Sequence, residues 1–311
     1  DLDFQLYEVH NASGLTSHPR YSDHSRETFD AVIDTATRMA ETLFAPHNRL
    51  ADEQEPEVVN GRVVLAEGVH LLQMLLAAGG QPDIIVLADH VSNDREVHAL
   101  LAQCPKARVV VVPDALFDQL ALTDSPSGLL VVSAQPGSER PADLGVDTLV
   151  LDRVQDPGNV GSLIRTAVAA GIRQIVLSPG CADPWSPRCL RAAQGAQWLS
   201  TVWADVDLTD FLEGYRGIIA ATLLDGGSLL YTHDLRQPTA WLFGNEGQGV
   251  DPALAAQATQ RVTIPMPGGV ESLNVNAAAA VCLFEQVRQR GRPASGNAQH
   301  HQTRRSLGWD R

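Results

Sequence analysis

The chain has 311 residues, a length that suits two domains better than one. Its hydrophobic content of 44% is that of a globular protein, and it contains no apolar run of about 18 residues, so we expect no membrane-spanning helix. The formal net charge of −14 argues against nonspecific binding of nucleic acid by the whole surface.

The charge is unevenly distributed along the chain. Residues 1–62 hold 12 acidic and five basic side chains, whereas residues 141–290 hold 15 acidic and ten basic ones, all ten of them arginines. Arginine is suited to bidentate recognition of phosphate, so a local basic face is compatible with a negative total. The four cysteines form no CxxC pair, which predicts reduced thiols in a cytoplasmic protein and no metal site.

The first 60 residues are acidic and predict a helical leader. Apolar side chains recur at helical spacing over residues 25–44, and Ser25 is placed to cap that helix. The stretch "ADEQEPE" at 51–57 is typical of a solvated linker.

Residues 61–135 predict a small α/β domain, because short apolar runs alternate with amphipathic ones as in a mostly parallel sheet. Strands are expected at 63–68, 83–88, 108–113 and 128–134, with helices at 69–79 and 94–104. Residues 136–146 are rich in turn formers and predict a linker.

Residues 147–290 predict a second α/β domain, with helices covering both faces of a parallel sheet. Strands are expected at 147–154, 174–180, 217–224, 239–246 and 261–266, with helices at 160–170, 251–258 and 274–289. Residues 291–311 are polar and basic, so we expect a disordered tail.

The stretch "DPGNVGSLIR" at 156–165 joins a strand to a helix and lacks the lysine of a triphosphate-binding loop. If Asn159 caps the helix, the apolar side chains of Leu163, Ile164 and Ala167 share one face, and Arg165 lies roughly 130° from its centre. Arg165 therefore points away from the core. Taken alone, this stretch fits a capped helix with a solvated arginine as well as it fits a functional site.

Two later strands also run into glycine-containing loops. "WLFGNEGQGV" at 241–250 places Glu246 among glycines, and "IPMPGGVESLNVNAAAAV" at 264–281 places Ser272 and Asn274 before an alanine-rich helix. Taken singly, Glu246 can be a solvated carboxylate, and Ser272 or Asn274 a helix cap. Because strand ends of open α/β sheets form ligand crevices, the three loops together predict one pocket lined mostly by backbone groups.

In this order and spacing, "DPGNVGSLIRTAVAAG", "LFGNEGQGV" and "IPMPGGVESLNVNAAAA" resemble motifs 1, 2 and 3 of the SpoU (TrmH-like) RNA ribose 2'-O-methyltransferases of the SPOUT superfamily. The preceding residues resemble the L30e-like substrate-binding domain that many members carry, so the likeness covers residues 61–290. It implies an L30e-like α/β domain followed by a SPOUT α/β-knot, a deep trefoil knot that pattern reasoning alone would not propose.

The resemblance also implies an activity: S-adenosyl-L-methionine-dependent methylation of a ribose 2'-hydroxyl of RNA by a cytoplasmic homodimer. The L30e-like domain favours 23S ribosomal RNA over tRNA as the substrate. The positions that match the family's catalytic or RNA-contacting residues are Arg165, Asn159, Glu246, Ser272 and Asn274. The positions that match its cofactor-binding residues are Thr222, Leu223, Gly244, Asn245, Gly247, Ile264, Met266, Ser272 and Leu273.

Arg165 resembles the family residue proposed as the base. An arginine is effectively always protonated, so binding the adjoining RNA phosphate and steadying the developing alkoxide is the chemically easier role. Both roles stay open at this point. The alternatives for the whole protein are a tRNA 2'-O-methyltransferase and an RNA-binding homologue without turnover.

Residues 1–60 depart from the family, whose members usually begin with a short basic stretch. They resemble the N-terminal helical leader of an acyl-CoA dehydrogenase subclass, over roughly a sixth of the chain. No flavin-binding segment or catalytic carboxylate accompanies them, so the resemblance implies a fused leader rather than dehydrogenase activity.

Overall fold

The computed structural model describes residues 63–122, 126–137 and 142–291. The chain divides after Gly61 into two units, and the described residues all belong to the second, Arg62–Arg311. The predictions for the acidic leader and for the basic tail beyond Gly291 lie outside the described residues.

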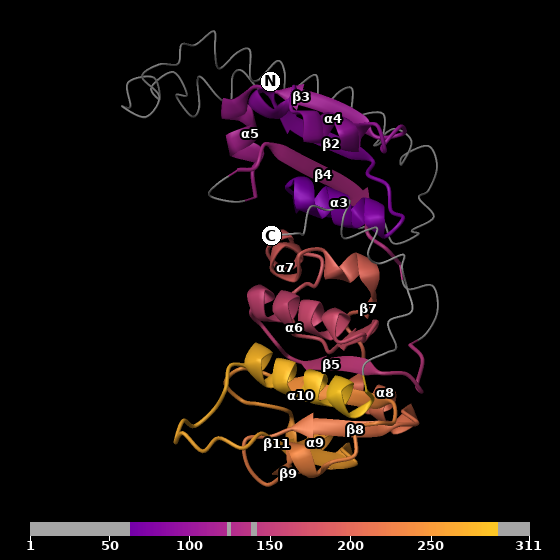
Figure 1. Cartoon of the computed structure of the whole chain (residues 1–311), viewed down its shortest axis with the longest axis vertical. Coiled ribbons are helices and arrows are strands. Elements are labelled where there is room, and N and C mark those ends of the chain that lie inside the picture. The colour runs from indigo at the N-terminus through magenta and orange to yellow at the C-terminus, as the bar shows by residue number, and fades with distance from the viewer. Residues whose placement is uncertain (1–62, 123–125, 138–141, 292–311) are drawn as a thin grey trace, which may run out of the picture. The chain divides into compact units, whose positions relative to one another are not determined.

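Residues 63–134 form a small α/β fold around a four-stranded sheet in the order β1-β4-β2-β3 (Figure 1). Every predicted strand and helix of this part is present. One helix, α5, was not predicted from the sequence. Phe117 is its one buried side chain, so the helix has no row of buried apolar residues whose spacing would indicate it. The elements in chain order are β1 (Val63–Glu67), α3 (Val69–Ala77), β2 (Ile84–Ala88), η5 (Asp89–Val91), α4 (Arg95–Leu101), β3 (Arg108–Val112), α5 (Asp114–Leu120) and β4 (Leu129–Ala134).

The prediction of a mostly parallel sheet is wrong for this part of the chain. β2 and β3 are parallel, but β4 lies between β1 and β2 and is antiparallel to both. Four of the six residues of β4 are buried, so its apolar run is that of a strand covered on both faces. Such a run gives no information on strand direction, which is why the sequence pattern suggested a parallel neighbour.

Residues 148–289 form a seven-stranded sheet in the order β7-β6-β5-β10-β8-β11-β9, and every strand pair in it is parallel, as predicted. The strands are β5 (Thr148–Asp152), β6 (Gln174–Leu177), β7 (Thr201–Trp203), β8 (Ile218–Thr222), β9 (Ser228–Leu229), β10 (Thr239–Gly244) and β11 (Gln260–Thr263). The helices are α6 (Pro157–Ala169), α7 (Pro187–Ala193), η6 (Ala196–Leu199), α8 (Leu208–Gly214), η7 (Leu230–Thr232), α9 (Pro252–Gln257) and α10 (Val275–Gln289).

Helices cover both faces of this sheet, which confirms the prediction. Successive side chains of a strand point to opposite faces, and β5 shows both sets of contacts. Leu149 and Leu151 pack with buried side chains of α6, α7 and α10, whereas Val150 packs with those of α8 and α9. The α/β class and the parallel arrangement of this sheet are therefore those expected from the sequence.

The N-terminus of α6 differs from the predicted one. The helix begins at Pro157 rather than at residue 160, and its cap is Asp156, whose carboxylate accepts a hydrogen bond from the N–H of Asn159 at 2.8 Å. Proline is favoured at the first helical position, and a carboxylate complements the helix dipole there. Asn159 therefore lies in the first turn, and its side chain is available for contacts outside the helix. Arg165 is exposed, as predicted.

Gly161 lets α7 pack closely against α6. A Cβ atom built on Gly161 would lie 2.4 Å from the carbonyl oxygen of Cys189 and 2.7 Å from the Cβ atom of Ala192. We expect Gly161→Ala to lower the free energy of unfolding by about 1–3 kcal/mol, the usual cost of overpacking, in urea denaturation. Ala169→Ser, at an exposed position of the same helix, should change it by less than about 0.5 kcal/mol. Equal losses in the two variants would contradict the packing explanation.

Candidate functional site

A cavity of about 490 Å³ lies at the carboxyl ends of β8, β10 and β11. Its lining residues come from four stretches of the chain, within 222–225, 243–250, 262–266 and 272–278. This volume falls within the range of about 300–1,000 Å³ that is usual for small-molecule sites. The position agrees with the crevice expected at the strand ends of an open α/β sheet.

The nine residues that were predicted to contact a cofactor all line this cavity. They come from three different strand ends and from the segment before α10, so the fold gathers them into one place. They are Thr222, Leu223, Gly244, Asn245, Gly247, Ile264, Met266, Ser272 and Leu273.

One wall of the cavity depends on the close approach of two backbone segments. A Cβ atom built on Gly244, the last residue of β10, would lie 2.2 Å from the carbonyl carbon of Gly249 and 2.2 Å from the amide nitrogen of Val250. Between these points the chain reverses, because the N–H of Gly249 donates to the carbonyl oxygen of Asn245 at 2.8 Å. Gly249 has a φ of 70°, in the left-handed region that favours glycine. The glycines are therefore what allows the loop to fold back at the cavity.

A chain of side-chain hydrogen bonds connects the three glycine-containing segments. The Nδ2 atom of Asn159 donates to Oε1 of Glu246 at 2.9 Å, and Nδ2 of Asn276 donates to Oδ1 of Asn159 at 2.7 Å. Asn274 caps α10, since its Oδ1 accepts from the N–H of Asn276 at 2.9 Å. Asn276 was absent from the predicted site. The signal for it was its place two residues after Asn274 in the same segment.

The predicted catalytic residues divide into three groups. Glu246, Ser272 and Asn274 line the cavity, and Asn159 contacts it through Glu246. Arg165 does not line the cavity of its own chain. It lies six residues after Asn159 on α6, about 9 Å further along the helix axis, with an exposed side chain. The structure therefore brings four of the five residues together and leaves Arg165 apart.

The side chains around the cavity give it a negative character. Asp225 and Glu246 are exposed carboxylates in its lining, and the lining contains no lysine, arginine or histidine. Apolar side chains, such as those of Leu223 and Ile264, supply much of the remaining surface. A ligand with an apolar or aromatic part and a net positive charge suits this lining best.

The cysteines do not contribute a reactive thiolate to this site. Burial raises the pKa of both Cys189 and Cys282 to about 12, and it also raises the pKa of Cys181 and Cys104. All four therefore stay protonated at neutral pH. In the described part of the chain, no group of three His, Cys, Asp or Glu side chains is placed to hold a metal ion, and no helix is long and apolar enough to cross a membrane.

Comparison with known proteins gives consistent matches to RNA methyltransferases. Residues 148–284 match the sequence model of the SpoU rRNA Methylase family. An uncharacterized tRNA/rRNA methyltransferase of Synechocystis is 34% identical over 278 residues, which covers 84% of this chain and 94% of the relative. The 23S rRNA (guanosine(2553)-2'-O)-methyltransferase RlmP of Bacillus subtilis is 31% identical, covering 71% of this chain and 86% of the relative.

The fold also matches solved structures. The AdoMet-bound rRNA methyltransferase of Sinorhizobium meliloti superposes with a TM-score of 0.64 at 29% sequence identity, over 76% of this chain and 92% of that one. The likeness thus extends beyond the residues that the family model matches.

Proposed function

This chain belongs to the SpoU rRNA methylase family, and we propose that it transfers a methyl group from S-adenosyl-L-methionine to a ribose 2'-hydroxyl of RNA, with 23S ribosomal RNA as the substrate. The observation that carries the proposal is the cavity at the strand ends, where Asn159, Glu246 and Asn276 connect the three glycine-containing segments. That arrangement joins a small-molecule pocket to polar groups able to orient a second substrate.

The residues of the cavity fit the proposed cofactor. S-adenosylmethionine carries two positive charges and one carboxylate, so its net charge complements Asp225 and Glu246. The apolar lining of Leu223, Ile264 and Leu273 suits an adenosine group, and the backbone around Gly244 supplies hydrogen-bonding groups. When bound, the cofactor supplies a methyl group made electrophilic by the adjacent positive sulfur. The chain itself then has to orient the hydroxyl, take its proton and exclude water.

The polar residues can divide these tasks. Asn159 donates a hydrogen bond to Glu246 at the cavity, and this carboxylate would accept the proton of the 2'-hydroxyl as the ribose oxygen takes the methyl group and the bond between methyl carbon and sulfur breaks. The guanidinium of Arg165 suits the adjoining phosphate and the negative charge that develops on the ribose oxygen. Ser272 and Asn274, at the start of α10, complete the polar lining.

A second copy of the chain is part of this proposal. Arg165 belongs to the motif that the family's active site requires, yet it does not line the cavity of its own chain. A homodimer in which α6 and α10 face a partner would bring Arg165 to the partner's cavity. Phe284 of α10 supports this arrangement, because its side chain is 47% exposed on a helix that packs against α6.

The RNA-binding face and the topology are further parts of the proposal. Residues 157–204 hold four arginines and one acidic side chain in a chain of net charge −14, which favours phosphate binding near α6 and α7.

We assign residues 61–135 to an L30e-like RNA-binding domain and 147–290 to a knotted SPOUT domain. The knot rests on the likeness to the SPOUT superfamily, in a sheet where β10 lies between β5 and β8 although it follows both in the chain. Action in the cytoplasm accords with four free cysteines.

The test is transfer of label from methyl-labelled S-adenosylmethionine to RNA transcribed in vitro. We expect a labelled 2'-O-methylated nucleoside after digestion of 23S rRNA and no label in a matched pool of tRNA transcripts. Label in tRNA alone would identify the alternative substrate. Cofactor binding without label in either RNA would instead support the alternative of an RNA-binding protein without turnover.

A further inference from the structure

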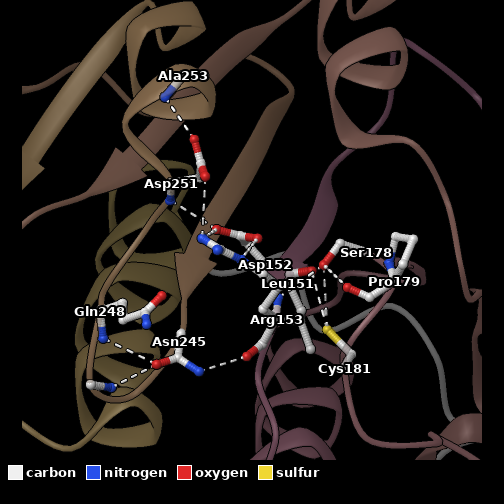
Figure 2. Close-up of polar contacts among 11 residues, drawn as sticks. Leu151, Asp152, Arg153, Ser178, Pro179, Cys181, Asn245, Gln248, Asp251 and Ala253 are labelled. Atoms are coloured by element: carbon white, nitrogen blue, oxygen red, sulfur yellow. Dashed lines mark hydrogen bonds and ion pairs between the residues drawn. The ribbon is translucent and has the colours of Figure 1, made fainter.

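Two residues at the end of β5, Asp152 and Arg153, contact both ends of the loop that lines the cavity (Figure 2). The backbone carbonyl of Arg153 accepts a hydrogen bond from Nδ2 of Asn245 at 2.9 Å. The carboxylate of Asp152 accepts one from the N–H of Asp251 at 2.8 Å. These anchor points bracket residues 246–250, and all five of them line the cavity.

The side chains of Asp152 and Arg153 also bind each other. Nε of Arg153 lies 2.9 Å from Oδ1 of Asp152, and Nη2 lies 3.1 Å from Oδ2. The same guanidinium is 3.4 Å from a carboxylate oxygen of Asp251. Asp152 is only 2% exposed, and a buried carboxylate is stable only when its oxygens are paired. Arg153 therefore pairs with the buried carboxylate of Asp152, and Asp152 in turn holds the backbone of Asp251.

Arg153 has an unusual backbone conformation that serves the same contacts. Its φ is 53°, in the left-handed region that disfavours residues other than glycine. Its N–H donates to Oγ of Ser178 at 2.9 Å, so the turn is fixed on the β6 side as well. The left-handed turn directs the carbonyl of Arg153 toward Asn245 and not along the strand (Figure 2).

Asn245 also makes hydrogen bonds inside the anchored loop, residues 245–251. Its Oδ1 accepts hydrogen bonds from the N–H groups of Gly247 at 2.9 Å and Gln248 at 3.0 Å, while its Nδ2 is held by Arg153. Neither Asp152 nor Arg153 lines the cavity. Their contacts therefore reach the cavity only through the position of the loop.

We infer that Asp152 and Arg153 are positioning residues that hold the 245–251 loop in the conformation that binds S-adenosylmethionine. This rests on the proposed function for the identity of the ligand. The clamp formed by Asp152 and Arg153 acts on cofactor binding through the loop that it anchors, and neither residue lines the cavity itself. Loss of the guanidinium should therefore raise the dissociation constant of the cofactor.

The sharpest variant is Arg153→Gly. Glycine adopts the left-handed conformation without strain and keeps the carbonyl that Asn245 binds, so the change removes the side chain with its guanidinium and leaves the backbone contact in place. We expect the dissociation constant for S-adenosylmethionine in calorimetry to rise about tenfold, as for loss of a charge-assisted pair. The KM for RNA should stay within about threefold, because the clamp contacts only the loop beside the cavity. Arg153→Lys, which keeps a charge beside Asp152, should recover part of the affinity.

Arg236→Gly is the matched control. Arg236 makes the same pair of hydrogen bonds, to Asp234 at 2.9 and 2.7 Å, but does not line or bracket the cavity. Its loss should leave cofactor affinity unchanged. An unchanged dissociation constant for S-adenosylmethionine in Arg153→Gly would contradict the positioning role of Asp152 and Arg153. So would a rise in the KM for RNA equal to the rise in that dissociation constant. Should Arg153→Gly fail to fold, Arg153→Lys gives the same comparison. If the wild type binds the cofactor but methylates no RNA, the proposed function fails while the binding arm still tests the clamp.

Discussion

Arg165→Ala lowers kcat for RNA methylation by about 10²–10³-fold, the loss expected when one donor to a developing negative charge is removed. The same change leaves the dissociation constant for S-adenosylmethionine within about threefold, because Arg165 does not line the cavity of its own chain. Single-turnover methylation and calorimetry measure the two quantities. Arg216→Ala, which removes another largely exposed arginine of the same sheet domain, should change neither. A parallel loss of cofactor binding in Arg165→Ala would show that this residue is structural.

In the proposed homodimer, mixed dimers test whether Arg165 serves the cavity of its own chain or that of its partner. If each Arg165 serves the cavity of its partner, a mixed dimer of Arg165→Ala and a cofactor-binding variant such as Gly244→Ala contains one intact site. At a cofactor concentration well below the dissociation constant of Gly244→Ala, coexpression with random pairing should then give about one quarter of wild-type activity, although each variant alone has only a few per cent or less. If Arg165 serves its own cavity, no mixed dimer contains an intact site, and activity stays at the level of the two variants. The experiment thus separates the dimeric site from a site within one chain.

Local sequence patterns predict the strands and helices that carry long apolar runs. They do not predict features that depend on tertiary contacts, such as the direction of a strand or the first residue of a helix. The buried runs of β5, β8 and β10 are visible in the sequence, and so is the parallel sheet they form. β9 and β7 have two and three residues, too few for a period to show. The direction of β4 depends on which neighbours it pairs with, and the start of α6 depends on competition between Asp156 and Asn159 as the cap.

The residues of the site also differ in whether the sequence predicts them. The cavity residues follow from motifs within which each member is close in sequence, so a family resemblance can locate them. Asn276 and Arg153 become meaningful only when distant segments meet, because their partners Asn159 and Asn245 lie 117 and 92 residues away. The left-handed φ of Arg153 has no sequence signal, since arginine rarely adopts it. Contacts that orient a loop are therefore harder to predict than the residues that the loop presents.

Gly244→Ala raises the dissociation constant for S-adenosylmethionine by about 10- to 100-fold, since a new Cβ atom has to displace backbone and not a flexible side chain. That atom would lie 2.2 Å from atoms of both Gly249 and Val250, so the loop that lines the cavity has to move away from β10. Calorimetry measures the affinity, and thermal unfolding monitors whether the sheet stays intact.

Gly247→Ala is the control for Gly244→Ala, because it makes the same chemical change in the same loop. A Cβ atom at Gly247 would have as its nearest neighbour Oδ1 of Asn245 at 3.6 Å, an ordinary contact distance, and Gly247 is not among the residues with a positive φ. Because Gly247 itself lines the cavity, the dissociation constant for the cofactor can rise in this variant, but it should rise less than in Gly244→Ala, where backbone has to move. Equal losses in the two variants would mean that any added methyl group in the loop blocks the ligand. Loss in Gly244→Ala alone would show that the close backbone contact shapes the cavity.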